Sequence, residues 1–218
     1  MPVVENLRAI RERIARAAER VGRSPNEVTL VAVTKSTDAA GIRAAFEAGV
    51  THFGENRLQE AVRKLAELPD LRARTTWHMV GHLQSNKAKS SIQIFDIIQS
   101  VDSVRLSEAL DRYADHPVSV FLEVNVAGET SKYGFRPEEL AEAYRTVSRL
   151  PMMTVRGLMT VAPQAPEPES VRPVFRRLRE LGRELELPAL SMGMTDDFEV
   201  AVEEGATVVR IGRALFSD

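Results

Sequence analysis

The chain has 218 residues, 44% of them hydrophobic, and its 29 Lys and Arg residues nearly balance 31 Asp and Glu residues. This length and apolar content suit a single domain over residues 1–218, and the absence of a long block of one charge argues against a nucleic-acid partner. There is no cysteine, which excludes disulfides and thiolate metal sites. The N-terminal segment is charged and no stretch has membrane-spanning length, so we expect a cytoplasmic protein without a membrane partner.

Short β-rich runs alternate with helical stretches along the chain. A helix is predicted over residues 3–21, because apolar residues from Leu7 to Val21 recur at three- and four-residue spacing. Eight strands are predicted after it, at residues 28–34, 52–55, 76–81, 94–100, 118–126, 154–161, 189–193 and 207–212. Helices are expected between them at residues 39–48, 57–68, 103–114, 137–150, 170–185 and 197–204.

The regular alternation of strands and helices defines the expected fold class. It implies crossover connections and a parallel sheet, and eight such units favour an α/β protein with a (β/α)8 TIM barrel and an extra N-terminal helix. The alternative is an open, doubly wound sheet that binds a dinucleotide. That fold would carry a glycine-rich turn after its first strand, whereas "LVAVTKSTD" contains no glycine.

Lys35 ends the first predicted strand, at the edge of the barrel where enzymes of this fold carry their chemistry. A lysine held among apolar walls loses hydration of its ammonium group, which favours the neutral, nucleophilic amine. A neutral amine is what an imine with an aldehyde requires. The alternative is a lysine that extends from the barrel top into water, and its position alone does not decide between the two.

The C-terminal segment adds two further features. The stretches "LSMGMTDD" and "VVRIGRALF" place turns after the seventh and eighth strands, where such barrels commonly bind phosphate. Arg210 lies inside the last strand and needs an acceptor, either a ligand or a carboxylate such as Glu123. A lysine on strand one, a phosphate cradle and an arginine between them together outline a site for pyridoxal 5′-phosphate (PLP).

The sequence resembles the pyridoxal phosphate homeostasis proteins, the YggS or PROSC family, over nearly its whole length. The shared motifs are "VAVTK", "HFGENRLQE", "WHMVGHLQSNK", "SVDS", "EVNVAGETSKYGF", "RGLMTVAP" and "LSMGMTDDFEVAVEEGATVVRIGRALF". The resemblance implies the barrel of the N-terminal domain of alanine racemase and PLP as cofactor. It also implies a Schiff base on Lys35, Arg210 at the pyridine nitrogen, phosphate contacts from Ser191, Gly212 and the backbone of Arg213, and a pocket lined by Asn56 and Met159.

Two residues depart from the family pattern. Thr195 stands where the family usually has serine and keeps a hydroxyl group. Arg213 stands where the family usually has threonine, which removes a hydroxyl donor to phosphate. It leaves the backbone N–H of residue 213 and the alternative of a new cationic contact through the guanidinium.

Another lysine and two histidines offer alternatives for imine formation and metal binding. Lys132 is the rival imine lysine, but it lies in a glycine-flanked loop where we expect it to stay hydrated and protonated. His78 and His82 are four residues apart, yet the first lies in a predicted strand, so a metal site is not expected.

Two function classes follow from this site. One is a binding protein for PLP homeostasis that stores the cofactor or delivers it to apo PLP-dependent enzymes, acting as a monomer. The other is a PLP-dependent amino-acid racemase or lyase. The binding protein is preferred because an arginine at the ring nitrogen weakens the electron sink, and because six residues follow Gly212, so we expect the racemase's additional domain to be absent. His82 and Tyr133 are the best-placed candidates for a second base.

Overall fold

Eight parallel strands close into a barrel in the computed structural model, which describes residues 2–217. Strand order follows the chain, and β8 pairs with β1 to close the barrel. The strands are β1 (Thr29–Val33), β2 (His52–Glu55), β3 (Thr76–Met79), β4 (Ile97–Val101), β5 (Val118–Glu123), β6 (Met153–Met159), β7 (Ala189–Ser191) and β8 (Val208–Ile211). The predicted TIM barrel and all eight predicted strands are confirmed, although several are shorter than expected.

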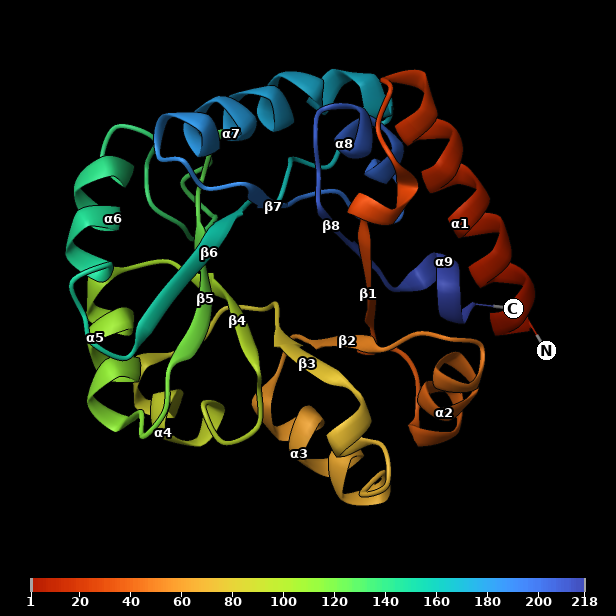
Figure 1. The fold of residues 1–218 in the computed structure, drawn as a ribbon, viewed down its shortest axis with the longest axis horizontal. Coiled ribbons are helices and arrows are strands. Elements are labelled where there is room, and N and C mark those ends of the chain that lie inside the picture. Colours follow the sequence, from red (N-terminus) through yellow and green to blue (C-terminus); the bar gives the residue numbers. More distant parts are fainter. Residues whose placement is uncertain (1, 218) are drawn as a thin grey trace.

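Helices form an outer ring around the strands (Figure 1). They are α1 (Pro2–Arg20), α2 (Ala39–Glu47), α3 (Leu58–Glu67), α4 (Ala88–Ser91), α5 (Val104–Tyr113), α6 (Leu140–Val147), α7 (Arg172–Glu184), α8 (Phe198–Glu203) and α9 (Arg213–Phe216). Short 3-10 turns lie at Pro25–Glu27, Arg72–Arg74, Ser85–Lys87 and Pro168–Val171. The sequence did not predict α4 and α9, because four residues are too few to show a helical period. Within the described residues, no helix has both the length and the apolar character to cross a bilayer.

The first helix covers the seam where the barrel closes. Its buried stripe includes Leu7, Ile10 and Ile14, as the spacing predicted. Asn6 Nδ2 donates to the carbonyl oxygens of Leu215 (3.2 Å) and Ser217 (2.9 Å), which ties α1 to the segment that contains α9. Figure 1 shows α1 and α9 side by side, next to β1.

The fourth strand begins three residues later than predicted, and Asp96 gives the reason. Its Oδ2 accepts the backbone N–H of Trp77 at 2.7 Å, and its carboxylate also pairs with Arg72. The side chain thereby uses an N–H group that β3 would otherwise offer for strand pairing. Residues 94–96 lie outside the strand, although the backbone N–H of Asp96 donates to the carbonyl oxygen of Trp77 at 2.9 Å, and the register with β3 begins at Ile97.

Alternation along the strands gives the barrel two environments. Successive side chains of a strand point to opposite faces, so every second residue enters the barrel. Val31, Phe121, Met159 and Val208 form a small apolar cluster of their own, separate from the large core beneath the helices. Arg210 follows Val208 by two positions on β8 and therefore also points into the barrel.

An ion pair lies buried between the barrel and α3. Lys64 and Glu55 are each 1% exposed, and Lys64 Nζ lies 2.5 Å from Glu55 Oε1. The same amine donates to the carbonyl oxygen of Thr34 at 2.6 Å, and the Thr34 hydroxyl donates to Glu55 Oε1 at 2.6 Å. The peptide that leads into Lys35 is therefore held by a charged side chain from outside the barrel.

Lys64→Met should lower the free energy of unfolding by about 3 to 5 kcal/mol, because the substitution leaves the carboxylate of Glu55 buried without its cation. Urea unfolding of the two proteins measures this difference. Arg63→Met is the matched control, since Arg63 lies on the same helix but makes exposed pairs. A loss no larger than that of the control would contradict a structural role for the buried pair.

Candidate functional site

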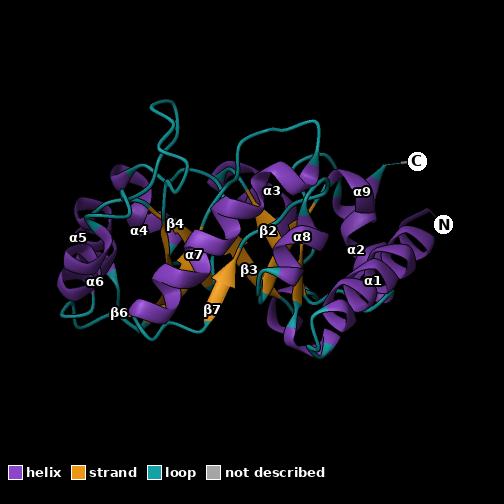
Figure 2. Cartoon of the chain, turned by 90° about the horizontal axis from the view of Figure 1, so that it is seen from above, coloured by secondary structure: helices purple, strands orange, loops and turns teal. Residues whose placement is uncertain are grey.

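The predicted site residues gather at the carboxyl ends of the strands. In Figure 2 the long loops rise from the face toward which the strand arrows point. Lys35 follows β1, Asn56 follows β2, Met159 and Ser191 end β6 and β7, Arg210 lies in β8, and Gly212 and Arg213 follow it. Because β1 pairs with β8, Val31 with Arg210 and Ala32 with Ile211, the lysine and the last turn are neighbours.

Arg210 is the charged group at the centre of this face. It is 4% exposed, and its guanidinium donates to Ser191 Oγ (2.6 Å) and to the carbonyl oxygen of Thr160 (2.8 Å). The alternative partner, Glu123, forms no ion pair with it within residues 2–217. Burial lowers the pKa of Arg210 to about 10, and the charges of Glu123 and Asp197 oppose this effect. Arg210 therefore stays cationic and keeps N–H donors for a ligand.

Ser191 is already engaged by protein groups. Its hydroxyl accepts from Arg210 and donates to Gln99 Oε1 at 2.6 Å. Gln99 is fully buried on β4, and its amide in turn contacts His78. This connection could not be predicted from the sequence, because Ser191 and Gln99 are 92 residues apart in the chain. The predicted contact of Ser191 with phosphate stays a prediction.

The surroundings of Lys35 differ from the prediction. Its side chain is exposed, so the expectation of apolar walls around it is wrong for this structure. The apolar part of the strand ends at Val33, and Thr34 is the last buried residue before the chain turns outward. Among residues 2–217, Lys35 Nζ has no hydrogen-bond or ion-pair partner, so the amine is available to a ligand that enters the barrel mouth.

The rival lysine is less exposed than expected. Lys132 is 26% exposed, and its Nζ lies 2.7 Å from Glu129 Oε1 and 3.3 Å from the carbonyl oxygen of Val161. Lys132 is therefore less hydrated than predicted. Since its amine is already engaged on the far side of the mouth from β1 and β8, Lys35 remains the better candidate for covalent attachment.

The turns after β7 and β8 approach each other. The backbone N–H of Ala214, in the first turn of α9, lies 3.4 Å from Thr195 Oγ1. A Cβ atom on Gly212 would lie 3.1 Å from the carbonyl oxygen of Val33, so a side chain there would crowd β1. Gly193 has φ of +90°, which favours glycine, and its carbonyl oxygen accepts the backbone N–H of Arg210 at 3.0 Å. These small residues leave backbone donors open toward the mouth.

The side chain of Arg213 turns to a neighbouring carboxylate. Its guanidinium lies 2.6 Å from Asp196 Oδ2, and the two side chains are 68% and 74% exposed. The backbone N–H of Arg213 begins α9, where it has no partner within the helix. Of the two phosphate contacts that the sequence left open for Arg213, the geometry therefore favours the one from the backbone N–H over the one from the guanidinium.

Asn56 and Met159 take different places. Met159 is fully buried, and its strand register sets it beside Glu123 and Ser191. Asn56 is exposed at the end of β2, and its backbone N–H donates to Glu55 Oε2 at 3.2 Å. Both lie at the face where the pocket was predicted, one beneath it and one at its rim.

Glu123 has the most strongly shifted pKa among the carboxyl groups of the mouth. Burial, together with the negative charge of Asp102, raises its pKa to about 7, although Arg210 opposes the change. It lines a cavity of about 150 Å³ with Asn125, Lys132 and Val161. A carboxyl group that is partly protonated near neutral pH can donate or accept a hydrogen bond there.

His82 forms a second polar cluster at the rim. Its Nδ1 lies 2.9 Å from Asp102 Oδ2, and its ring stacks on Tyr133 with centroids 3.6 Å apart. The two side chains predicted as the best second bases are therefore packed against each other. His78, the other member of the suggested metal pair, is buried inside the barrel instead.

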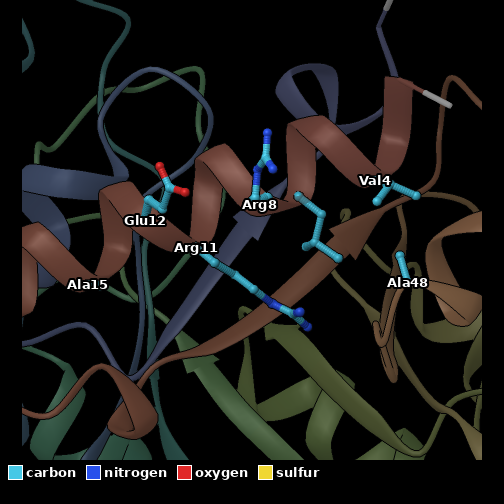
Figure 3. Close-up of a pocket in the computed structure, with 7 residues that line it drawn as sticks. Val4, Arg8, Arg11, Glu12, Ala15 and Ala48 are labelled. Carbon is cyan, nitrogen blue, oxygen red and sulfur yellow. The ribbon is translucent and has the colours of Figure 1, made fainter.

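A larger hollow, about 420 Å³, lies away from this face, along α1 and against the end of α2 (Figure 3). Its lining includes Arg8, Arg11 and Ala48. Arg11 Nη2 is bonded to the carbonyl oxygen of Gly49 at 2.9 Å. The hollow joins α1 to the end of α2 and shares no residue with the barrel mouth.

Comparison with known proteins identifies the class of barrel to which the chain belongs. The family model described as "Alanine racemase, N-terminal domain" matches residues 6–218. An alanine racemase from Clostridium difficile 630 superposes with a TM-score of 0.71 at 15% identity, over 98% of this chain and 57% of the racemase, which is a likeness of fold alone. The chain is thus built on the alanine racemase barrel.

Closer relatives identify the family. A "Pyridoxal phosphate homeostasis protein" from Aquifex aeolicus is 43% identical, over 100% of this chain and 99% of the relative. One from Pseudomonas aeruginosa is 44% identical, over 98% and 94%. The structure of PipY from Synechococcus elongatus with PLP bound has a TM-score of 0.85 at 39% identity, over 99% of this chain and all of PipY. The chain belongs to the family of pyridoxal phosphate homeostasis proteins.

Glu123→Gln should raise stability at neutral and higher pH. The folded protein keeps a proton on Glu123 up to about pH 7, whereas the ordinary value is 4.5, so this group makes stability fall as pH rises between those values. The variant removes this dependence and should be more stable at pH 8 by up to about 3 kcal/mol. Urea unfolding at pH 4 and pH 8 measures it. Glu138→Gln, at an exposed site, is the control; equal stability of wild type and Glu123→Gln at pH 8 would contradict the buried proton.

Proposed function

We propose that this protein binds PLP, attaches it through Lys35, and stores the cofactor or delivers it in PLP homeostasis. The observation that carries the proposal is the buried guanidinium of Arg210, which has no carboxylate partner within residues 2–217 and points to the barrel mouth. Its remaining donors suit a neutral acceptor such as a pyridine nitrogen. The names of the relatives and the PLP bound to PipY support the same ligand.

Each predicted residue has a place in this proposal. The backbone of Gly212 and Arg213 and the turn with Thr195 would hold the phosphate, and Met159 and Asn56 would border the ring. Lys35 would offer its unengaged amine. Ser191 would contact the phosphate, as predicted, while its hydroxyl also accepts from Arg210. Bound there, the cofactor would supply an aldehyde for the lysine and an electron-withdrawing ring.

The donor character of Arg210 supports storage over catalysis. A guanidinium at the ring nitrogen requires that nitrogen to accept, so the ring stays unprotonated and withdraws electrons less strongly. Racemisation also needs an acid and a base on opposite faces of the substrate carbon. His82 and Tyr133 are stacked on each other and paired with Asp102, so the observations favour the binding function over a racemase or lyase.

The partners belong to the same proposal. A carrier would meet apo PLP-dependent enzymes, and a monomer in the cytoplasm would leave its barrel mouth open to them. The open face at the carboxyl ends of the strands, with Lys35 exposed, supports transfer of a small ligand from that side.

Borohydride reduction of the PLP-loaded protein should fix the cofactor on Lys35, and peptide mass spectrometry locates it. Lys35→Ala should lose the attachment and keep its stability within about 0.5 kcal/mol, because the side chain is exposed. Lys132→Ala is the matched control and should retain the label. Label found on Lys132 in the wild type would refute the assignment of Lys35.

Arg213→Thr should change the affinity for PLP by less than about threefold, because the guanidinium is exposed and turned to Asp196. Titration of the apo protein with PLP, followed by absorbance, measures this affinity. Arg8→Ala, on α1 and away from the barrel mouth, controls for loss of surface charge. A tenfold weaker affinity would show that the side chain leaves Asp196 and contacts the phosphate.

A further inference from the structure

A chain of hydrogen-bonded side chains crosses the interior of the barrel below Arg210. Arg210 Nη1 donates to Ser191 Oγ at 2.6 Å, and Ser191 Oγ donates to Gln99 Oε1 at 2.6 Å. Gln99 Nε2 lies 2.8 Å from His78 Nδ1, and His78 Nε2 lies 3.0 Å from His52 Nδ1. The five side chains come from β8, β7, β4, β3 and β2.

The chain has a direction, and Arg210 sets it. A guanidinium can only donate, so Ser191 accepts from it and has one proton to give. That proton goes to the carbonyl oxygen of Gln99, which turns the amide N–H₂ toward His78. His78 Nδ1 must then accept, so its proton lies on Nε2 and points to His52.

Burial agrees with this order. His78 is 2% exposed, and burial together with His52 lowers its pKa to about 3, so it is neutral and has a single ring proton. Burial also lowers the pKa of His52, at the amino end of β2, although Asp96 opposes the change. The chain therefore starts at a cation near the carboxyl face and ends at a neutral imidazole near the opposite face.

The opposite direction would need a different set of protons. Ser191 would have to accept from both Arg210 and Gln99, and His78 would have to carry its proton on Nδ1 to meet the amide oxygen. The distances alone would permit either arrangement of the amide. In the structure the Gln99 amide oxygen faces Ser191 and the amide nitrogen faces His78, which is the direction that starts at Arg210. The position of the ring proton on His78 distinguishes this direction from the opposite one.

We propose that Gln99 is a positioning residue for Arg210. Its amide oxygen accepts a hydrogen bond from the Ser191 hydroxyl, which turns a lone pair of the serine oxygen toward Arg210 Nη1. This contact holds the guanidinium in the orientation that faces the barrel mouth. The carbonyl of Thr160 fixes the other nitrogen at 2.8 Å, so the plane of the guanidinium is set by two contacts. The consequence for PLP rests on the function proposed above.

Nitrogen-15 NMR of the cofactor-free protein tests the chain directly. In the wild type, His78 should carry its proton on Nε2, and the guanidinium protons of Arg210 should exchange slowly with water. In Gln99→Met, which keeps the length of the side chain, those protons should lose their protection. A proton on Nδ1 of His78 in the wild type, or unchanged protection in Gln99→Met, would overturn the proposal.

Gln99→Glu separates the two ends of the amide. A carboxylate still accepts from Ser191, so Arg210 should stay protected, but it cannot donate to His78. His78 should then carry a proton on Nδ1. Loss of Arg210 protection in Gln99→Glu would overturn the proposal, and this variant decides the question if Gln99→Met does not fold.

Ser100→Ala is the matched control. Ser100 is the next residue of β4, is fully buried, and its hydroxyl has no hydrogen-bond partner among residues 2–217. Its loss should leave both NMR signals unchanged. A change as large as that of Gln99→Met would show that the signals report general packing, and would overturn the proposal.

Affinity for PLP supplies the second measurement. Gln99→Met should bind PLP about tenfold more weakly than the wild type, the effect of one disturbed hydrogen bond to a charged group, while Ser100→Ala should match the wild type. Equal affinity in Gln99→Met would overturn the positioning role. A wild type that did not bind PLP would refute the proposed function instead, and the NMR signals would still decide the chain.

Discussion

The enclosed guanidinium of Arg210 is the constraint on which the rest of the barrel interior depends. A cation taken out of water needs acceptors, and no carboxylate within residues 2–217 pairs with it. The strands supply a hydroxyl from Ser191 and a backbone carbonyl from Thr160 instead. Each neutral acceptor then needs its own partner, which explains why Gln99 and His78 are buried where barrels of this kind usually pack aliphatic side chains.

The charge at the mouth follows from the pairing of Arg210 with neutral acceptors. Since Arg210 is not neutralised by contact, its field reaches Glu123 and Asp197, whose pKa values burial nevertheless raises. A mouth with a fixed cation, a partly protonated Glu123 and open backbone donors is suited to an anionic ligand that also has a neutral acceptor. Burial disfavours the charged forms of Arg210, Glu123 and Asp197, so folding stability is lower than it would be without these groups in a binding site.

The sequence predicted the parts of this site that depend on local pattern. Strand alternation and the order of elements were enough to place Lys35, Arg210 and the last turn at one face, and the resemblance supplied their roles. The hydrogen-bond partners were not predictable, because barrel closure selects them from strands far apart in the chain, as with Ser191 and Gln99. The exposure of Lys35 was not predicted, because the apolar pattern of β1 says nothing about residues beyond Val33, the last residue that pairs with β2.

The buried environment expected for Lys35 belongs instead to Lys64. That amine is enclosed between α3 and the barrel, where it pairs with Glu55 and holds the carbonyl of Thr34. The two lysines therefore differ in role: Lys64 fixes the backbone at the end of β1, and Lys35 follows this fixed segment with an exposed side chain. Because the Lys35 side chain is exposed, any loss of hydration that favours a neutral amine would have to come from a ligand that covers the mouth.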